Sequence, residues 1–249
     1  MTMAPIPTVS IYGVRVSRLN MRQTVDYLTE TIERGVPQQV VTANPIILMA
    51  GLDNSSFMQT LREAELVVPD GTGLVWAASH IGQPVAERVA GYDLIHELMK
   101  VGSPRGWKVY LLGAAPGIAE AAAEKLESLY PGIRIVGCRD GFFPASEDDD
   151  VIADVTAAAP HLLLVARATN NQDPWIGKYK DRLRVPVMMG VGGSFDVLAG
   201  RVKRAPLFFQ RLRLEWLYRL LREPSRLPRM LVLPKFVLKV LRDKENVSK

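Results

Sequence analysis

Asp70 is a candidate for acid–base chemistry because of the residues around it. It follows the apolar run 66–69 and precedes Gly71 and Gly73. A carboxylate placed after a buried strand lies at the carboxyl edge of a sheet, which is where ligands of α/β proteins bind. From there it could take the proton of a hydroxyl nucleophile as a bond forms. The same pattern also fits a turn aspartate that caps the following helix, and the residues alone favour that second interpretation.

Two neutral polar side chains lie at the end of another predicted strand, 39–42. Thr42 and Asn44 could hydrogen-bond a sugar from this position. The alternative is helix capping, because asparagine is a favoured N-cap residue and Pro45 suits the first turn of a helix. Both interpretations stay open at the level of sequence.

Charged residues gather in the predicted polar loop 87–93. Arg88 could balance the negative charge of a diphosphate, or it could pair with Glu87 or Asp93. Arg88 is therefore a candidate substrate-binding residue.

A glycine-containing turn lies between a predicted strand, 108–112, and a predicted helix, 118–130. Gly113 and Gly117 would let the backbone approach a diphosphate at the N-terminus of that helix. With the strand 133–137 that follows, these segments form one βαβ unit. The turn lacks the full G-x-G-x-x-G spacing, and a packing role for its glycines is equally open.

Other kinds of catalytic site find little support in the sequence. The chain contains three histidines, none in a metal-ligand spacing, and a single cysteine, Cys138. A zinc site and a Cys–His nucleophile are therefore not predicted, and neither a G-x-S-x-G motif nor a P-loop lysine is present. One cysteine allows no internal disulfide, which favours the cytosol.

The elements that must position these residues alternate between strand-like and helix-like apolar patterns, which predicts a layered α/β fold. Strands are predicted at 9–16 (as a strand or a hairpin bent at Gly13), 39–42, 66–69, 108–112, 133–137, 161–165 and 185–191. Helices are predicted from Pro45 onward and at 21–34, 55–63, 118–130, 148–159 and 174–183.

The charge of the chain is unevenly distributed. Its 249 residues carry a net charge of +5, with 48% hydrophobic and 23% charged residues, as in an ordinary folded protein. Residues 1–199 contain 17 Lys or Arg and 22 Asp or Glu, whereas residues 200–249 contain 14 and 4. The basic tail therefore predicts contact with a polyanion. No apolar run approaches the roughly 20 residues needed to cross a bilayer, and residues 1–10 do not resemble a signal peptide.

The tail from Arg201 mixes arginines with large apolar side chains. Prolines should divide it into short helices, at 206, 224, 228 and 234. Arginines recur at helical spacings, at 211, 219, 222, 226 and 229. Short basic helices with apolar faces are typical of proteins that lie on a membrane surface, which is the interpretation we favour. The alternative is a helical hairpin packed on the core with a solvated basic side.

A series of short motifs runs along the chain in a fixed order. They are 41–45 (VTANP), 69–73 (PDGTG), 87–93 (ERVAGYD), 110–113 with 116–117, 130–133 (YPGI), 190–196 (GVGGSFD), 198–206 (LAGRVKRAP), 215–220 (EWLYRL) and 223–224. Each motif is modest, but the ordered set is specific. From about Ile11 to Leu241 the chain resembles the TagA/WecG/CpsF family of glycosyltransferases.

This resemblance implies a Rossmann-like fold with a mostly parallel sheet flanked by helices. It implies a catalytic domain over 1–200, with an N-terminal lobe at about 1–105 and a Rossmann-like lobe at about 106–200. A basic helical appendage over 201–249 would bring the enzyme to the membrane. The expected enzyme is inverting, metal-independent and without a cofactor. It would be cytoplasmic and peripheral at the inner face of the plasma membrane, acting in cell-surface polysaccharide or teichoic acid synthesis.

The resemblance also implies substrates and residue roles. Typical members transfer N-acetylmannosamine from its UDP derivative to undecaprenyl-diphosphate-linked N-acetylglucosamine, and others use glucuronic or mannosaminuronic acid. Carried onto this sequence, Asp70 is the base and Arg88 contacts a diphosphate, while Thr42 and Asn44 line the sugar pocket. Candidates for contact with the acceptor's diphosphate or with lipid headgroups are Arg211, Arg219, Arg222 and Arg226.

One segment departs from the family pattern, in which a loop usually ends Pro-Lys-Gln-Glu-x-Trp-Ile. The chain keeps Gln172, Trp175 and Ile176, and we expect Gln172 to bind substrate. The proline, lysine and glutamate are replaced by Asn170, Asn171 and Asp173. Arg167 stands where the family usually has an apolar residue.

Three other functions stay open. A family member that lost activity through the altered loop 168–173 would act as a binder of nucleotide sugar or lipid diphosphate, and it ranks above the other two. A nucleotide-dependent oxidoreductase would fit the βαβ unit, although no acidic residue closes the strand 133–137 where a ribose contact is needed. A non-catalytic protein could bind nucleic acid through the tail, but we expect no nucleic acid partner. A homo-oligomer is compatible with the sequence.

Overall fold

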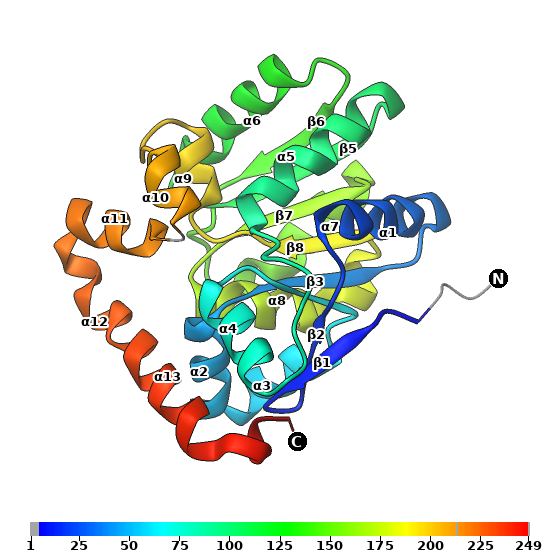
Figure 1. The fold of residues 1–249 in the computed structure, drawn as a ribbon. Coiled ribbons are helices and arrows are strands. Elements are labelled where there is room, and N and C mark those ends of the chain that lie inside the picture. Colours follow the sequence, from blue (N-terminus) through cyan, green and yellow to red (C-terminus); the bar gives the residue numbers. More distant parts are fainter. Residues whose placement is uncertain (1–4, 213, 249) are drawn as a thin grey trace.

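The computed structural model describes residues 5–212 and 214–248. Their strands form one eight-stranded sheet in the order β1-β2-β4-β3-β8-β7-β5-β6 (Figure 1). The strands are β1 Thr8–Ile11, β2 Val14–Ser17, β3 Gln38–Ala43, β4 Leu66–Pro69, β5 Lys108–Gly113, β6 Arg134–Arg139, β7 Leu162–Ala166 and β8 Val187–Gly190. β1 and β2 are antiparallel, and the other neighbouring pairs are parallel. The predicted α/β class with a mostly parallel sheet is confirmed.

Helices cover both faces of this sheet (Figure 1). One face carries α1 Met21–Arg34, α5 Gly91–Gly102, α6 Ile118–Leu129 and α9 Ser194–Leu198. The other face carries α2 Pro45–Asp53, α3 Ser55–Glu63, α4 Thr72–His80, α7 Asp148–Ala158 and α8 Thr169–Leu183. Short 3-10 helices, η1 Ser103–Arg105 and η2 Ala145–Glu147, complete the connections. Successive strand residues such as Val40 and Val41 enter opposite cores, so the central strands are buried on both faces.

Local sequence signals account for the boundaries that were predicted well. Asn20 and Gln23 form a reciprocal capping box at the start of α1, and Gly35 ends that helix in a left-handed conformation with φ 66°. Tyr12 and Gly13, with φ 53° and 78°, form the two-residue turn between β1 and β2. This turn geometry matches the twist of paired strands, which confirms the predicted hairpin.

Two predicted boundaries are wrong. The helix predicted to begin at Pro174 begins at Thr169, with Pro174 inside it. Its first turns are polar and lack the apolar spacing that marks a helix in sequence, although Gln172 and Asp173 are buried. The loop predicted over 87–93 is shorter, because α5 begins at Gly91. Asp93 therefore lies in the first turn of α5, where a negative charge is favourable.

Strands from both predicted lobes lie in the same sheet. β3, from the segment before residue 105, pairs through its residues 38–41 with β8, from the segment after it. The carboxyl ends of β3, β4, β5, β7 and β8 therefore meet at one edge of the sheet.

The basic tail forms a chain of short helices along one side of the molecule (Figure 1). They are α10 Leu207–Arg211, α11 Glu215–Arg222, η3 Pro224–Arg226, α12 Leu227–Met230, α13 Val232–Asp243 and η4 Lys244–Ser248. Phe236 and Val240 of α13 are fully buried in the core formed with α2, α3 and α4. The Val247 carbonyl oxygen accepts a hydrogen bond from Tyr12 N at 2.7 Å, so the tail returns to the β1–β2 turn. Within the described ranges, no helix is long and apolar enough to span a bilayer.

Candidate active site

A cavity of about 1400 Å³ opens at the carboxyl edge of the sheet. Each of five parallel strands contributes residues at or just beyond its end. These residues are Thr42 and Asn44 from β3, Asp70 and Gly71 from β4, Ala114 and Ala115 from β5, Ala166 and Arg167 from β7, and Val191 and Gly192 from β8. The cavity is therefore in the place where open α/β sheets bind their ligands.

The basic tail forms another wall of this cavity. Its lining residues come from the segment after α9 and from α11 through α13, and they are Arg201, Val202, Arg204, Glu215, Trp216, Arg219, Glu223, Arg226, Arg229, Met230, Leu233, Pro234, Phe236 and Val237. Core and tail thus share one site, although they are distant in sequence.

Asp70 lies at the end of β4 and faces the charged part of the cavity. Burial raises the pKa of its carboxyl to about 6, against the opposing effects of Arg88, the Gly91 N–H and Arg219. Glu215 raises this pKa further. A carboxylate with such a pKa is mostly ionised at neutral pH and is a stronger base than an exposed aspartate, which suits a general base.

The capping interpretation of Asp70 is wrong. The N-cap of α4 is Gly71, and no side chain caps this helix. The Asp70 N–H donates to the carbonyl oxygen of Ala43 at the end of β3, at 2.9 Å. It also donates to the carbonyl oxygen of Val68 in β4, at 3.0 Å. The side chain is therefore not used in holding the next helix.

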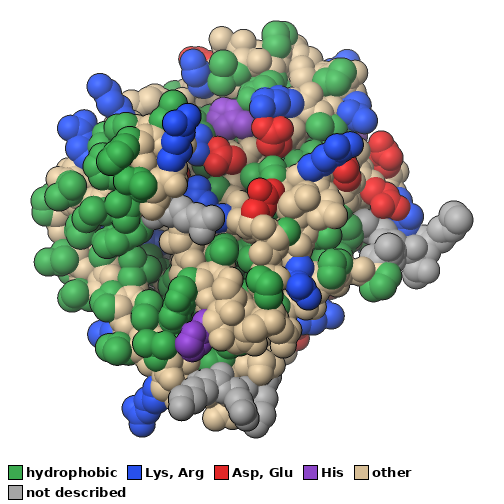
Figure 2. Space-filling view, in the orientation of Figure 1, with side chains coloured by type: hydrophobic (Ala, Val, Ile, Leu, Met, Phe, Trp, Pro, Cys, Tyr) green, Lys and Arg blue, Asp and Glu red, His purple; other side chains and the backbone are tan. Residues whose placement is uncertain are grey.

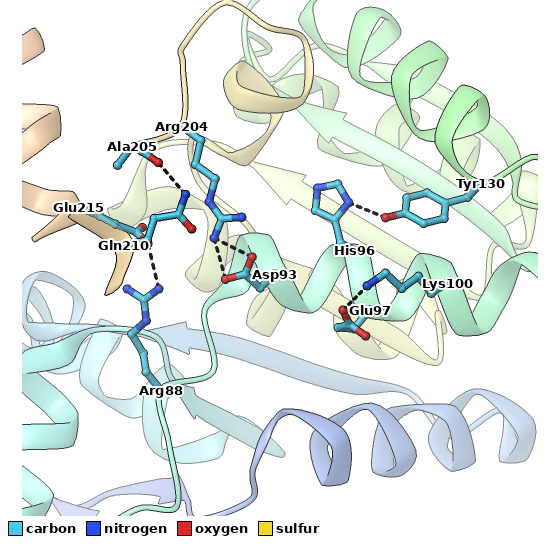
Figure 3. Close-up of polar contacts among 10 residues, drawn as sticks. All are labelled: Arg88, Asp93, His96, Glu97, Lys100, Tyr130, Arg204, Ala205, Gln210 and Glu215. Atoms are coloured by element: carbon cyan, nitrogen blue, oxygen red, sulfur yellow. Dashed lines mark hydrogen bonds and ion pairs between the residues drawn. The ribbon is translucent and has the colours of Figure 1, made fainter. Parts of the chain in front are cut away.

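Arg88 connects the core to the tail. Its Nη2 donates to Glu215 Oε1 at 3.1 Å, and the two side chains are only 21% and 18% exposed (Figure 3). The alternative pairing of Arg88 with Glu87 or Asp93 is wrong. Glu87 accepts from the Met21 N–H at 2.5 Å instead. A partly buried ion pair such as Arg88–Glu215 fixes the position of α11 against the site.

Arg204 lies close to this pair and was not predicted as a site residue. Its Nη2 contacts both carboxylate oxygens of Asp93 at 2.7 and 2.8 Å (Figure 3). Its guanidinium lies over the Tyr92 ring at 4.8 Å. Arg204 and Tyr92 both line the cavity. The Arg204–Asp93 ion pair therefore holds the segment after α9 against the first turn of α5.

Thr42, Asn44 and Gln172 line the cavity as predicted, and each also makes a structural hydrogen bond. Thr42 Oγ1 donates to the Gly190 carbonyl oxygen at 3.0 Å, which ties β3 to β8. Asn44 Oδ1 caps α2 by accepting from the N–H groups of Ile46 and Ile47, so the capping interpretation is confirmed. Gln172 Oε1 accepts from the Gly192 N–H at 2.9 Å. These side chains are held in place before any ligand binds.

The predicted binding residues divide into two groups by position. Arg88, Arg219 and Arg226 line the cavity, whereas Gly113, Arg211 and Arg222 do not. A Cβ at Gly113, where φ is 130°, would lie 2.2 Å from the Ala166 carbonyl oxygen. Glycine is required there for the close approach of β5 and β7. Arg211 and Arg222 are exposed on α10 and α11.

Several cavity residues were missed by sequence reasoning. They are Phe142, Phe143, Arg167, Asp196, Arg201, Arg204, Glu215 and Arg229. Arg201, Arg204 and Glu215 lie within the ordered motifs of the sequence, so these motifs could have indicated them as site residues. Nothing in the sequence marks the two phenylalanines. Among the described residues, His, Cys, Asp and Glu form no group of three or more that could hold a metal ion.

Comparison with known proteins identifies the family of the chain. Residues 9–249 match the model of the glycosyl transferase WecG/TagA/CpsF family. A Bacillus spizizenii protein is 39% identical over 211 residues, covering 84% of this chain and 81% of the relative. Proteins of Bacillus subtilis and Staphylococcus aureus are each 33% identical, covering 96% and 97% of this chain and 93% and 95% of the relatives. All three are named N-acetylglucosaminyldiphosphoundecaprenol N-acetyl-beta-D-mannosaminyltransferase. The chain therefore belongs to the WecG/TagA/CpsF family and is a glycosyltransferase.

Proposed function

We propose that this glycosyltransferase moves N-acetylmannosamine, or a closely related sugar, from a UDP-sugar to undecaprenyl-diphosphate-linked N-acetylglucosamine. The names of relatives that align over more than 80% of both chains support this substrate class. A cell-surface polysaccharide or a teichoic acid would be the product of the pathway.

The observation that carries the proposal is Asp70, a partly buried carboxylate that lines the cavity beside Arg88 and Arg219 and has a pKa of about 6. In an inverting transfer, Asp70 removes the proton of the acceptor hydroxyl as its oxygen bonds to the anomeric carbon. The bond from that carbon to the β-phosphate oxygen breaks at the same time, and UDP leaves. Arginines in the cavity compensate the charge that grows on the leaving diphosphate, without a metal ion.

The tail wall supplies the positive charge that binds the diphosphate of the acceptor. Burial lowers the pKa of Arg229. The positive charges of its neighbours Arg226 and Arg219 lower this pKa further. Crowded positive charges raise the free energy of the empty site, so a bound diphosphate relieves repulsion as well as forming hydrogen bonds. These residues are our candidates for the lipid-linked diphosphate.

The outer side of the tail supports contact with the membrane. Figure 2 shows hydrophobic side chains gathered on the side of the molecule where the tail helices lie. The exposed apolar residues of the tail are Leu207, Phe208, Leu212, Trp216, Leu221, Leu227, Leu231, Val237, Leu238 and Leu241. Arg211 and Arg222 are exposed on the same helices. A large exposed apolar surface with basic residues fits an anionic lipid surface, where the acceptor's lipid would be anchored.

A donor and acceptor panel tests the proposal. UDP-N-acetylmannosamine, UDP-N-acetylglucosamine and UDP-glucuronic acid are offered with and without the lipid-diphosphate-linked N-acetylglucosamine, and UDP release is measured. We expect release that needs the acceptor and is fastest with UDP-N-acetylmannosamine. The Asp70→Asn variant serves as the inactive control. Release without acceptor, or no release with any UDP-sugar, would contradict the proposed transfer.

A further inference from the structure

Arg167 differs from the other arginines of the cavity in what surrounds it. It follows β7, and its side chain lies beside Gly141, whose N–H donates to the carbonyl oxygen of Ala114 in the β5–α6 turn at 2.9 Å. A Cβ at Gly141 would lie 3.0 Å from Gly113 Cα and 3.1 Å from Arg167 Cγ. The glycine at 141 therefore leaves the space through which the Arg167 side chain enters the cavity.

The Arg167 guanidinium is held by an aromatic ring and a carbonyl group. It lies over the Phe143 ring at 4.1 Å from the centroid. Its Nη2 makes a long hydrogen bond of 3.4 Å to the Phe143 carbonyl oxygen. Stacking on an aromatic face fixes the plane of a guanidinium and leaves most of its N–H groups available. The head group is thus positioned, and its donors are largely unused.

No carboxylate in the described part of the chain forms an ion pair with Arg167. Three other arginines of the cavity do have such partners: Arg88 pairs with Glu215, Arg204 with Asp93, and Arg226 with Glu223. The acidic group that acts on Arg167 electrostatically is Asp148. Both oxygens of Asp148 are already engaged, one by Trp175 Nε1 at 2.8 Å and the other by the Tyr179 hydroxyl at 2.7 Å.

A partly buried guanidinium without a counter-ion has lost hydration that no opposite charge of the protein replaces. Burial lowers the pKa of Arg167, but an arginine keeps its charge in any physiological range. Removing a charge from water costs free energy unless an opposite charge compensates it. The planar fork of donors matches the oxygens of a phosphate or a carboxylate. The compensating group must therefore be supplied by a ligand.

We propose that Arg167 binds an anionic oxygen group of the nucleotide-sugar donor, either a phosphate of the UDP moiety or a carboxylate on the sugar. This inference rests on the proposed function, because it takes a UDP-sugar as the donor. Arg167 lies with Ala114, Ala115 and Gly141 at the β5–β7 side of the cavity, whereas the arginines assigned to the acceptor lie on the tail. An acidic donor sugar would make Arg167 a determinant of donor specificity.

Binding of three probes, measured by titration calorimetry without acceptor, tests the proposal. The probes are UDP, UDP-N-acetylmannosamine and UDP-glucuronic acid, and the variants are Arg167→Leu, Arg167→Lys and the exposed control Arg15→Leu. We expect Arg167→Leu to weaken binding about tenfold or more, Arg167→Lys to weaken it less, and Arg15→Leu to leave it unchanged. A loss shared by all three probes assigns a phosphate, and a loss confined to UDP-glucuronic acid assigns the carboxylate.

Equal affinities of wild type and Arg167→Leu for all three probes would overturn the proposal. An equal loss in Arg15→Leu would overturn it too, because the effect would then be general electrostatics. If Arg167→Leu does not fold, Arg167→Lys carries the test through its smaller shift, with unchanged affinity overturning the proposal. Failure of the proposed function has a different result, in which wild type itself binds none of the three probes.

Discussion

The two walls of the cavity are built on different physical principles. On the sheet-edge wall, polar side chains are held by hydrogen bonds to the backbone, as with Thr42 and Gly190, and the strands behind them are fully buried. On the tail wall, α10, α11 and α12 contain no buried residue. In the described part of the tail helices, the side chains that enter a core lie further along, Phe236 and Val240 on α13 and Val247 on η4.

Under the proposed function, the sheet-edge wall would carry the chemistry and the tail wall would bind the lipid-linked substrate. A base must be held rigidly, because small displacements of a reacting group are costly in rate. A surface that meets lipid needs exposed apolar side chains, which a rigid core would bury. The Arg88–Glu215 ion pair is one contact that fixes the second wall to the first, in addition to the packing of α13 on α2 and α4. Variants of the two walls should therefore have different effects.

The largest expected effect is at the sheet-edge wall. Asp70→Asn should lower kcat by about 10²- to 10⁴-fold, because the amide cannot accept the acceptor's proton. Its affinity for UDP should stay close to that of wild type. Transfer assays with a calorimetric UDP titration check both values. An unchanged kcat would remove Asp70 from the mechanism.

The same variant should be more stable than wild type at high pH. The folded-state pKa of Asp70, about 6, lies above the ordinary aspartate value of 3.8, so folding favours the protonated form. The cost of the ionised carboxylate is therefore absent below about pH 4, grows as pH rises from about 4 to about 6, and is constant above that range. Asp70→Asn should raise the free energy of unfolding by up to about 3 kcal/mol at pH 8 and change it little at pH 3. Urea unfolding at the two pH values checks this.

Anchoring of the tail wall depends on α13. Phe236→Ala should lower the free energy of unfolding by about 3–5 kcal/mol, because it leaves a cavity in a closely packed core. Phe208→Ala, on α10, should change it by no more than about 0.5 kcal/mol, since Phe208 is 66% exposed. Urea unfolding of both variants measures the contrast. Similar losses in both would show that α10 is not the loosely held surface described above.

Membrane contact should depend on the exposed apolar side chains of the tail. The double variant Leu207→Ser with Phe208→Ser should weaken partition onto anionic vesicles by about tenfold or more, because each buried apolar side chain contributes about 1.5–3 kcal/mol. The matched control is Val36→Ser with Leu129→Ser, which removes two exposed apolar side chains elsewhere. Vesicle sedimentation is the measurement. Equal weakening by both pairs would show that the tail has no special role.

The smallest expected effect is a shift of the acid limb of the pH–rate profile. Arg88 lowers the pKa of Asp70 and Glu215 raises it. Arg88→Gln should therefore move the limb to higher pH, and Glu215→Gln should move it to lower pH, each by up to about one pH unit. Profiles of kcat/KM from pH 5 to about 8 measure the shifts. Shifts of the same sign would contradict the arrangement of these charges around Asp70.

Local rules predicted much of the fold and rather less of the site. The start and end of α1 follow from Asn20, Gln23 and Gly35, which act within a few residues of each other. The Pro174 boundary failed because buried polar residues conceal a helix from any apolar pattern. Asp70, Thr42, Asn44 and Gln172 were predicted because they lie at strand ends or in recognisable motifs.

Long-range pairings were beyond such reasoning. Arg88 and Glu215 are 127 residues apart, and Asp93 and Arg204 are 111 apart. Which acid each arginine meets depends on the order of the strands and on the path of the tail, and no local pattern encodes either. Arg167 was noticed only as an unusual residue, and its open donors became visible once its neighbours were placed.

The return of α13 to α2 and α4 has a consequence for the order of folding. All eight strands precede the tail helices in the chain, so the sheet can form before the tail docks. The cavity is complete only once Phe236 and Val240 of α13 have packed into the core with α2 and α4, because residues of the tail line one of its sides.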